Sequence, residues 1–395
     1  MSADVIVVGA GVIGLGIAWR AAAAGLETVV ADPRPRMGAS WAAAGMLAPV
    51  TEVAYGEEAL LRLNLRAARR WPAFAAELTE ASGHDLGFHT SGTLLIALDA
   101  DDNAALARVH AYQTELGLSA RRLRGREART IEPLLTPAVR GGVLAEGDHR
   151  VDPRAVTGAL VAAAGSAGVT FAGHRAAAVR TSGGPDATRV TGVRLDDGTE
   201  LAAGRVVLAA GCWSGGVEGL PAGLRPPVRP VKGQIVTLRD PSGRRFMART
   251  VRGMVRGRTV YLVPRDDGRV VVGATVEEQG FDTRVTAGGV SRLLRDGAAL
   301  VPGIEELDLV ETRAGLRPGS PDNRPLIGES GLPGLAVAAG HYRNGMLLAP
   351  VTADAVGALL TGGAVPEWAG DAAPGRFAAG RGAGAHAATT SEVRS

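Results

Sequence analysis

Length, charge and cysteine content already limit what the chain can be. It has 395 residues, with 43 lysines and arginines against 40 aspartates and glutamates, and a formal net charge of +3. A chain of this length exceeds the usual single hydrophobic core, so we expect two lobes. The basic residues are scattered, which gives no indication of a nucleic-acid surface. Cys212 stands alone, which excludes internal disulfides and cysteine-rich metal centres.

The longest apolar stretch has neither the length nor the flanks of a membrane segment. It covers residues 5–19 and is shorter than the ~20 residues that a membrane-spanning helix needs. It also lacks a basic leader of the kind found in secretory signals. We therefore expect a cytoplasmic protein without a membrane span, a metal ion or a nucleic-acid partner.

The N-terminal segment has the pattern of a nucleotide-binding turn. Residues 5–8 are β-branched and apolar, as in a buried parallel strand, and Gly9, Gly11 and Gly14 follow. The first glycine permits a tight turn, the second a close approach to a diphosphate, and the third close packing of a helix predicted at 12–24. The free N–H groups and positive dipole end of that helix suit a diphosphate.

Asp32 completes this pattern. It follows a second predicted strand, residues 27–31, and its carboxylate can accept hydrogen bonds from both hydroxyls of an adenosine ribose. Strand, glycines, helix, strand and acid in this order predict a Rossmann-like α/β dinucleotide-binding domain. The pattern alone leaves NAD and FAD open, and Arg34 and Arg36 leave room for a 2′-phosphate.

The rest of the chain alternates between predicted helices and strands. The run of small residues at 38–49 would let the backbone approach a flat ligand, although it also fits an alanine-rich helix start capped by Ser40. From Gly370 onward no periodicity remains, and we expect a disordered tail. Further helices are predicted at 57–81, 101–116, 154–164, 291–300 and 346–360, and strands at 87–98, 169–180, 190–195, 198–201, 205–211, 226–240, 259–264, 269–275 and 335–339.

Seven segments in this order carry a family resemblance. They are the N-terminal fingerprint and residues 42–47, 207–214, 229–233, 261–265 with 271–275, 314–319 and 338–350. Together they resemble the FAD-dependent amine and amino-acid oxidases of the D-amino-acid oxidase superfamily, and within it the thiamine-biosynthetic glycine oxidases.

The resemblance implies a division of the chain. We expect an FAD-binding domain of the glutathione-reductase type at 1–85, 145–222 and 320–369. A second, mainly antiparallel substrate domain is expected at 86–144 and 223–319, followed by the tail at 370–395.

The resemblance also implies where the cofactor lies. Sarcosine-oxidase relatives attach their flavin through a cysteine near the position of Gly315, and none is present here, so noncovalent FAD is expected. The implied or fingerprint-derived FAD contacts are Gly9, Gly11, Val12, Ile13, Gly14, Asp32, Ala39, Ser40, Ala44, Gly45, Met46, His341, Tyr342, Arg343, Asn344, Gly345, Met346 and Leu347.

Three residues are implied at the substrate. Arg317 would pair with a substrate carboxylate, helped by Tyr261, with Arg343 nearby. A planar guanidinium can hold a carboxylate through two parallel hydrogen bonds, and a tyrosine adds a neutral donor. The alternatives are a structural arginine paired with Glu311, Asp322 or another acid, and a tyrosine that only fills the core.

The implied reaction is oxidative deamination of glycine, sarcosine or small D-amino acids. The products would be an imine or 2-oxo acid, ammonia or amine, and hydrogen peroxide from oxygen, with the imine supplying the thiazole of thiamine. Val276 stands where the glycine-oxidase pattern has methionine, which leaves the substrate preference open. We further expect a homo-oligomer.

Four other functions stay open at this point. They are a D-amino-acid dehydrogenase that passes electrons to a quinone, a sarcosine-type oxidase, a flavin-dependent tRNA-modifying enzyme, and a dinucleotide-binding regulator without catalysis. The scattered basic residues argue against the tRNA enzyme.

Overall fold

Two eight-stranded sheets hold most of the strands in the computed structural model, which describes residues 2–183 and 188–377. The first sheet contains β1 (Ser2–Val8), β2 (Thr28–Ala31), β8 (Thr170–Ala172), β9 (Ala176–Ser182), β10 (Arg189–Leu195), β11 (Glu200–Leu208), β17 (Leu326–Glu329) and β18 (Leu335–Ala339). The second contains β4 (Thr93–Ala97), β5 (Arg121–Arg124), β6 (Gly141–Ala145), β12 (Arg229–Arg239), β13 (Thr250–Val255), β14 (Arg258–Pro264), β15 (Arg269–Gly273) and β16 (Asp308–Gly319).

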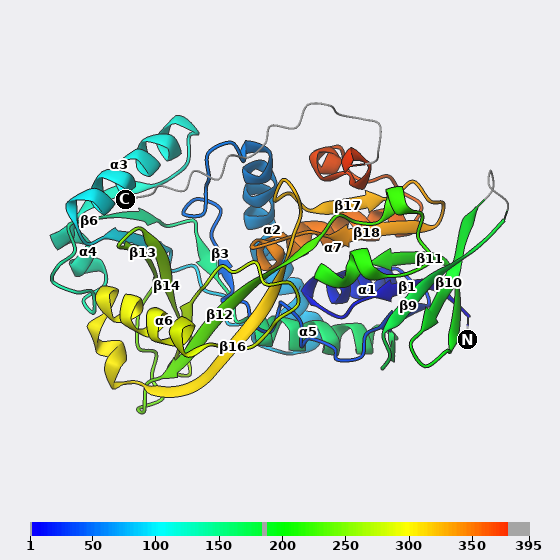
Figure 1. The fold of residues 1–395 in the computed structure, drawn as a ribbon, viewed down its shortest axis with the longest axis horizontal. Coiled ribbons are helices and arrows are strands. Elements are labelled where there is room, and N and C mark those ends of the chain that lie inside the picture. The colour runs from blue at the N-terminus through cyan, green and yellow to red at the C-terminus, as the bar shows by residue number, and fades with distance from the viewer. Residues whose placement is uncertain (1, 184–187, 378–395) are drawn as a thin grey trace.

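Seven α-helices accompany these sheets in the described ranges. They are α1 (Val12–Ala23), α2 (Glu58–Ser82), α3 (Ala100–Glu115), α4 (Gly125–Ile131), α5 (Pro153–Ser166), α6 (Ala287–Leu300) and α7 (Gly345–Leu360). Figure 1 shows β9 and β10 at one end of the molecule and α3, α4 and α6 at the other. None of the helices in the described part of the chain is long and apolar enough to cross a membrane.

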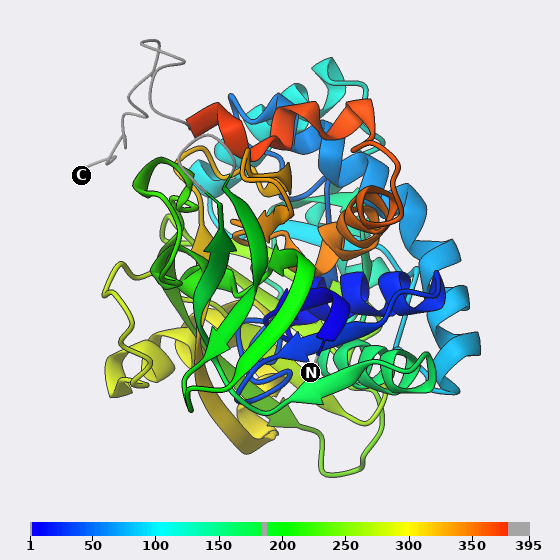
Figure 2. The same ribbon diagram turned by 90° about the vertical axis from the view of Figure 1, so that its right-hand side faces the viewer.

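The first sheet is covered on both faces, which explains its continuous apolar strands. Its main path runs β17-β18-β11-β1-β2-β8, with parallel pairing from β18 to β8. Val5 and Val7 of β1 pack into the core formed with α1, α2, α5 and α7, while Ile6 and Val8 pack on the side of β9 and β10. Figure 2 shows these helices gathered on one side and the β9–β10 strands on the other.

β11 corrects one sequence prediction. The segments 198–201 and 205–211 were expected as two separate strands, but Glu200–Leu208 forms a single strand. Its first residues pair antiparallel with β10, and Val206 to Leu208 lie between β1 and β18. Burial therefore alternates at the start of the strand and becomes continuous at its end. In the sequence this change of hydrophobic pattern resembles the boundary between two strands.

The second sheet is antiparallel except for the pair β13–β4. The predicted hairpin of β14 and β15 is confirmed. No strand was predicted at 308–319, where glycines and a proline interrupt the alternation. β16 forms there because it pairs with β12 along almost its whole length.

The element ends differ from prediction where a local interaction decides them. α6 begins at Ala287 rather than 291, because the Thr286 hydroxyl accepts a hydrogen bond from the Gly289 N–H at 3.2 Å. The strand predicted at 87–98 is shorter, since Gly92 has a φ of 78° and β4 begins only at Thr93.

The predicted disordered tail begins too early. Residues from Gly370 to Phe377 belong to two short 3₁₀ helices, Glu367–Ala372 and Pro374–Phe377. Ala372 is buried, and Arg376 forms an ion pair with Asp322 at 2.9 Å, so this segment is fixed to the body of the protein. Residues 378–395 lie outside the described residues, and the domain boundaries stay a prediction.

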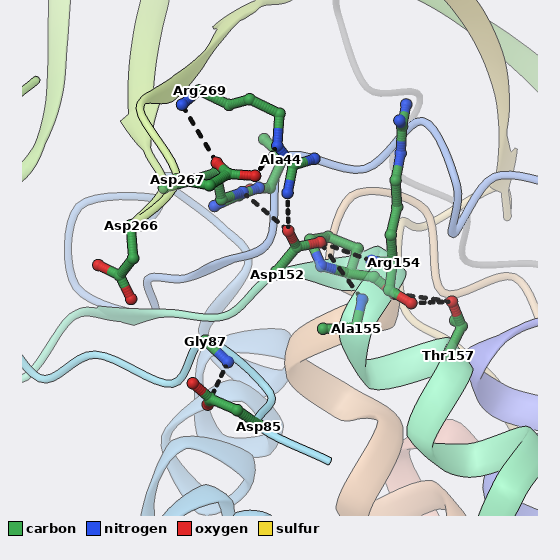
Figure 3. Close-up of polar contacts among 12 residues, drawn as sticks. Ala44, Asp85, Gly87, Asp152, Arg154, Ala155, Thr157, Asp266, Asp267 and Arg269 are labelled. Atoms are coloured by element: carbon green, nitrogen blue, oxygen red, sulfur yellow. Dashed lines mark hydrogen bonds and ion pairs between the residues drawn. The ribbon is translucent and has the colours of Figure 1, made fainter. Parts of the chain in front are cut away.

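Asp152 joins the helical layer of the first sheet to the second sheet (Figure 3). One carboxylate oxygen caps α5 by accepting from the Arg154 N–H at 2.8 Å, and the other accepts from Arg269 at 2.8 Å. Arg265 lies 3.7 Å from the same oxygen and is almost fully buried. Its Nη2 donates to the carbonyl of Ala44 at 2.5 Å. The cluster therefore fixes the loop around Ala44 against the β14–β15 hairpin.

We predict that Asp152→Ala lowers the free energy of unfolding by about 3 kcal/mol or more, because it leaves Arg265 as a buried, unpaired cation and removes the α5 cap. Asp152→Asn keeps the cap and should cost less. Urea denaturation measures both variants. An Asp152→Ala protein as stable as the wild type would contradict the assignment.

The ion pairs of Asp152 with Arg265 and Arg269 also predict that the stability of the fold depends on pH. Burial raises the pKa of Asp152, but Arg265 and Arg269 outweigh it and hold that pKa below its ordinary value. The ionised carboxylate therefore stabilises the fold above its unfolded pKa of about 4, and this contribution is lost as the pH falls further. The stability difference between wild type and Asp152→Asn should shrink below that pH.

Candidate functional site

A cavity of about 560 Å³ is lined by residues of both sheets. This volume is in the range of pockets that bind small molecules and cofactors. Its walls include the β1–α1 turn, the small residues at 38–46, the end of β11, the loop before α7, and strands β14 and β16. The lining contains most of the residues predicted to contact the cofactor; Gly14, Asn344 and Leu347 are not part of it.

The turn between β1 and α1 forms one end of the cavity. A Cβ on Gly9 would meet the Ala209 backbone, and a Cβ on Gly14 would meet the Gly9 carbonyl, so strand and helix can approach this closely only with glycine. The Ser40 hydroxyl accepts from the N–H of Val12 at 3.0 Å. Ser40 therefore caps the amino end of α1 from the loop, rather than starting a helix of its own.

Asp32 lies at the rim of this end. Its two carboxylate oxygens accept from the backbone N–H groups of Ala10 and Arg34, both at 2.7 Å. These bonds fix the carboxylate at the cavity wall, and each oxygen retains a second acceptor position. Arg36 is turned away, since its guanidinium donates to the Arg154 carbonyl.

The loop before α7 forms another part of the cavity wall. His341, Tyr342, Arg343, Gly345 and Met346 line the cavity. His341 is buried, its Nε2 lies 3.0 Å from the Thr352 hydroxyl, and burial lowers its pKa to about 3. The imidazole is therefore neutral.

Asn344 and Leu347 act behind this wall. The Asn344 carbonyl accepts from the Leu348 N–H at 2.8 Å at the start of α7, and the Leu347 carbonyl accepts from the Trp71 indole N–H at 2.8 Å. They hold the start of α7 in place without lining the cavity.

Arg317 and Tyr261 lie together at the inner part of the cavity. The Nη1 of Arg317 donates to the carbonyls of Thr275 at 3.2 Å and Lys232 at 3.4 Å. Both of these bonds use Nη1, and the guanidinium also hydrogen-bonds the Tyr261 hydroxyl, so the two side chains form one donor group at the cavity. Burial raises the pKa of the Tyr261 hydroxyl, although the charge of Arg317 opposes it. The hydroxyl therefore stays protonated near neutral pH.

Arg317 is not a structural partner of the acids considered for it. Glu311 forms ion pairs with Arg154 and Arg313, and Asp322 pairs with two other arginines. Arg317 therefore pairs with neither of these two acids.

Two strand glycines make room for these side chains, and sequence reasoning gave them no role of this kind. A Cβ on Gly233 of β12 would collide with the guanidinium of Arg317. A Cβ on Gly273 of β15, directly opposite Tyr261 on β14, would collide with the tyrosine ring. Glycine inside a strand often marks such a close approach, so a signal was present in the sequence.

Glu52 and Arg252 were also missed. Both line the cavity, and they form an ion pair with 3.0 Å between the Arg252 Nη1 and the Glu52 Oε1. The two residues are 200 positions apart and carry no local signal that distinguishes them from surface charges.

Arg343 is the third guanidinium of the inner cavity, beside Arg317 and Arg252. Its side chain forms no hydrogen bond or ion pair with any residue of 2–183 or 188–377, and Glu52 is the largest influence that raises its pKa. With three guanidiniums and one carboxylate, this part of the cavity carries a positive charge that suits an anionic group.

These features fit a dinucleotide that ends in a flat ring. The turn and the amino end of α1 suit a diphosphate, Asp32 suits a ribose, and the small residues at 38–46 leave a surface for a planar group. In the described ranges no group of three or more histidine, cysteine, aspartate or glutamate side chains could hold a metal ion.

Comparison with known proteins agrees with this geometry. The family model described as FAD dependent oxidoreductase, DAO, matches residues 4–359. The glycine oxidase of Geobacillus kaustophilus is 36% identical over 360 residues, which are 88% of this chain and 90% of that protein. The crystal structure of glycine oxidase from the same organism matches with a TM-score of 0.85 at 33% identity, covering 94% of this chain and 98% of that chain.

A further relative is the bifunctional protein ThiO/ThiG of Nostoc sp., which is 32% identical over 361 residues. The match covers 91% of this chain and 53% of that protein. Together the matches confirm the family resemblance, the α/β fold class and FAD as the cofactor. The chain therefore belongs to the DAO family of FAD-dependent oxidoreductases and is a flavin-dependent enzyme.

Proposed function

We propose that this enzyme oxidises glycine, and also sarcosine and small D-amino acids, with oxygen as the electron acceptor and hydrogen peroxide as a product. The observation that carries the proposal is the guanidinium of Arg317, anchored on one nitrogen and facing the cavity beside Tyr261. The likeness to glycine oxidases supports the choice of glycine.

The substrate carboxylate would bind to Arg317. The carbonyls of Thr275 and Lys232 hold the plane of the guanidinium, so little conformational freedom is lost when a carboxylate pairs with it. The neutral Tyr261 hydroxyl would donate a further hydrogen bond without repelling the substrate's amino group. Together they would orient the α-carbon for reaction.

When bound, FAD supplies an acceptor for the hydride that leaves the substrate's α-carbon. The chain would hold it through the β1–α1 turn, Asp32, the loop at 38–46 and the residues before α7. No general base is needed if the substrate's amine binds unprotonated, because its lone pair forms the new carbon–nitrogen double bond. The imine product then hydrolyses in water.

Binding of FAD would be noncovalent. A Cβ at Gly315 would collide with the Cβ of Ala42, so a cysteine at this position would not fit the present backbone. Cys212 lines the cavity, but its side chain is buried and burial raises its pKa to about 12. The thiol is therefore uncharged and a poor nucleophile.

A role in thiamine biosynthesis is a further part of the proposal. It rests on the likeness to the ThiO/ThiG protein and on the implied imine product.

The dehydrogenase alternative differs in its electron acceptor, and nothing at the site favours a quinone over oxygen. Hydrogen peroxide formed under air from glycine, sarcosine or D-alanine supports an oxidase. Anaerobic bleaching of the flavin by these amines without peroxide under air would instead indicate the dehydrogenase.

We predict that Arg317→Ala raises the KM for glycine about 100-fold or more, since two charge-assisted hydrogen bonds are lost. The ratio of bound flavin to protein should stay unchanged. Arg62→Ala serves as a control, because Arg62 forms an exposed ion pair with Asp371. If Arg317→Ala keeps the wild-type KM, the carboxylate assignment is wrong.

A second prediction concerns Gly233. Gly233→Ala should raise the KM for glycine about 10-fold or more without loss of flavin, because the added methyl group displaces the Arg317 guanidinium. Gly204→Ala, in β11, is the matched control, since a Cβ there meets no atom within 4 Å. Equal KM values for the two variants would refute this role of Gly233.

A further inference from the structure

Glu52 is the one acidic residue of the described cavity lining that lies among the residues assigned to the substrate. The other lining acids are elsewhere: Asp32 is at the β1–α1 turn, and Glu218 pairs through its backbone with Ala177. Glu52 instead forms an ion pair with Arg252, and its charge raises the pKa of both Arg343 and Tyr261. Its side chain is only 13% exposed.

The backbone beside Glu52 is anchored by a buried carboxylate. Asp148 is fully buried, and its two oxygens accept from the N–H of Val50 at 2.9 Å and the N–H of Thr51 at 2.7 Å. It also accepts from the Thr51 hydroxyl at 2.7 Å. The chain just before Glu52 therefore has little freedom to move.

Arg252 forms an ion pair with Glu52. Its Nη1 lies 3.0 Å from one Glu52 oxygen, and Arg252 itself is only 9% exposed. A carboxylate can accept about four hydrogen bonds, and Arg252 satisfies one of these positions. Acceptor positions on Glu52 therefore remain for a ligand in the cavity.

We propose that Glu52 binds the substrate's amino group and stabilises the positive charge that forms on its nitrogen during oxidation. The inference deepens the proposed function and rests on it. The α-carbon–hydrogen bond breaks, and its electron pair leaves with the hydrogen to the two-electron acceptor. The nitrogen lone pair forms a carbon–nitrogen double bond, so the oxidised substrate is an iminium cation that later loses a proton to water.

The positive charge that forms on the substrate nitrogen is the reason why the Glu52 carboxylate would speed the reaction. The nitrogen becomes more positive as hydride leaves, so a fixed negative group beside it stabilises the transition state more than the neutral amine. Arg317 cannot do this, because it is a cation and pairs with the other end of the substrate. Removing one preorganised group of this kind typically slows the chemical step about 100-fold to 1,000-fold.

The test uses Glu52→Gln in the FAD-loaded enzyme, since glutamine keeps the size and an acceptor but not the charge. We expect the anaerobic rate of flavin reduction by glycine to fall about 100-fold. Acetate, which has a carboxylate and no amine, should bind within about 3-fold of wild type, because Arg317 is intact. Glu278→Gln is the matched control, as its ion pair with Arg229 is exposed.

The pH profile separates this function from a merely structural one. A negative group within about 5 Å raises the pKa of a bound amine by 1–3 units. In a plot of the flavin-reduction rate against pH, one rise reports deprotonation of the bound amine. Loss of the Glu52 charge should therefore shift that rise to lower pH. Glu52→Asp, which keeps the charge, should restore part of the rate.

Three results would overturn the inference: an unchanged reduction rate in Glu52→Gln, an unchanged pH limb, or equal weakening of acetate and glycine. If the wild-type flavin is reduced by no amine at all, the proposed function itself fails. If the wild type reduces its flavin with amines and Glu52→Gln does so at the same rate, only the inference about Glu52 is rejected.

Discussion

A guanidinium or an aromatic ring can approach a neighbouring strand this closely only where that strand carries no side chain. Gly233 and Gly273 meet this condition under Arg317 and Tyr261. Both glycines are on strands that pair on two sides, so their positions are fixed by backbone hydrogen bonds rather than by loops. The part of the cavity where we propose that the substrate binds is therefore held by the backbone of the second sheet, and precise orientation of a small substrate requires such a rigid support.

The cavity also depends on how the two sheets are joined. Arg265 reaches from the end of the second sheet to the carbonyl of Ala44, and Asp152 balances its charge from the amino end of α5. Burying this arginine is costly, and burial lowers its pKa to about 10. The arrangement sets the distance between a loop that lines the nucleotide half and the hairpin that carries Tyr261.

The sequence predicted the nucleotide half of the site better than the substrate half. Strand, glycines, helix and Asp32 follow one another within about thirty residues, and each has a local signature. Arg317 and Tyr261 came from the family motifs. Glu52 is in a turn before α2 and Arg252 is on β13, so only the tertiary fold brings them together, and in the sequence they look like surface charges. β16 was missed for the same reason: its pairing with β12 outweighs the glycines and proline that disguise it.

The balance of charges in the inner cavity bears on selectivity. Guanidiniums alone would bind any small carboxylate, including one without an amine. A carboxylate in the same space favours a ligand that carries a positive or hydrogen-donating nitrogen, and disfavours one with a second anionic group. Arg252 balances the charge of this carboxylate, since its Nη1 lies 3.0 Å from a Glu52 oxygen. The ion pair, rather than the anion site, would then distinguish an amino acid from a simple acid.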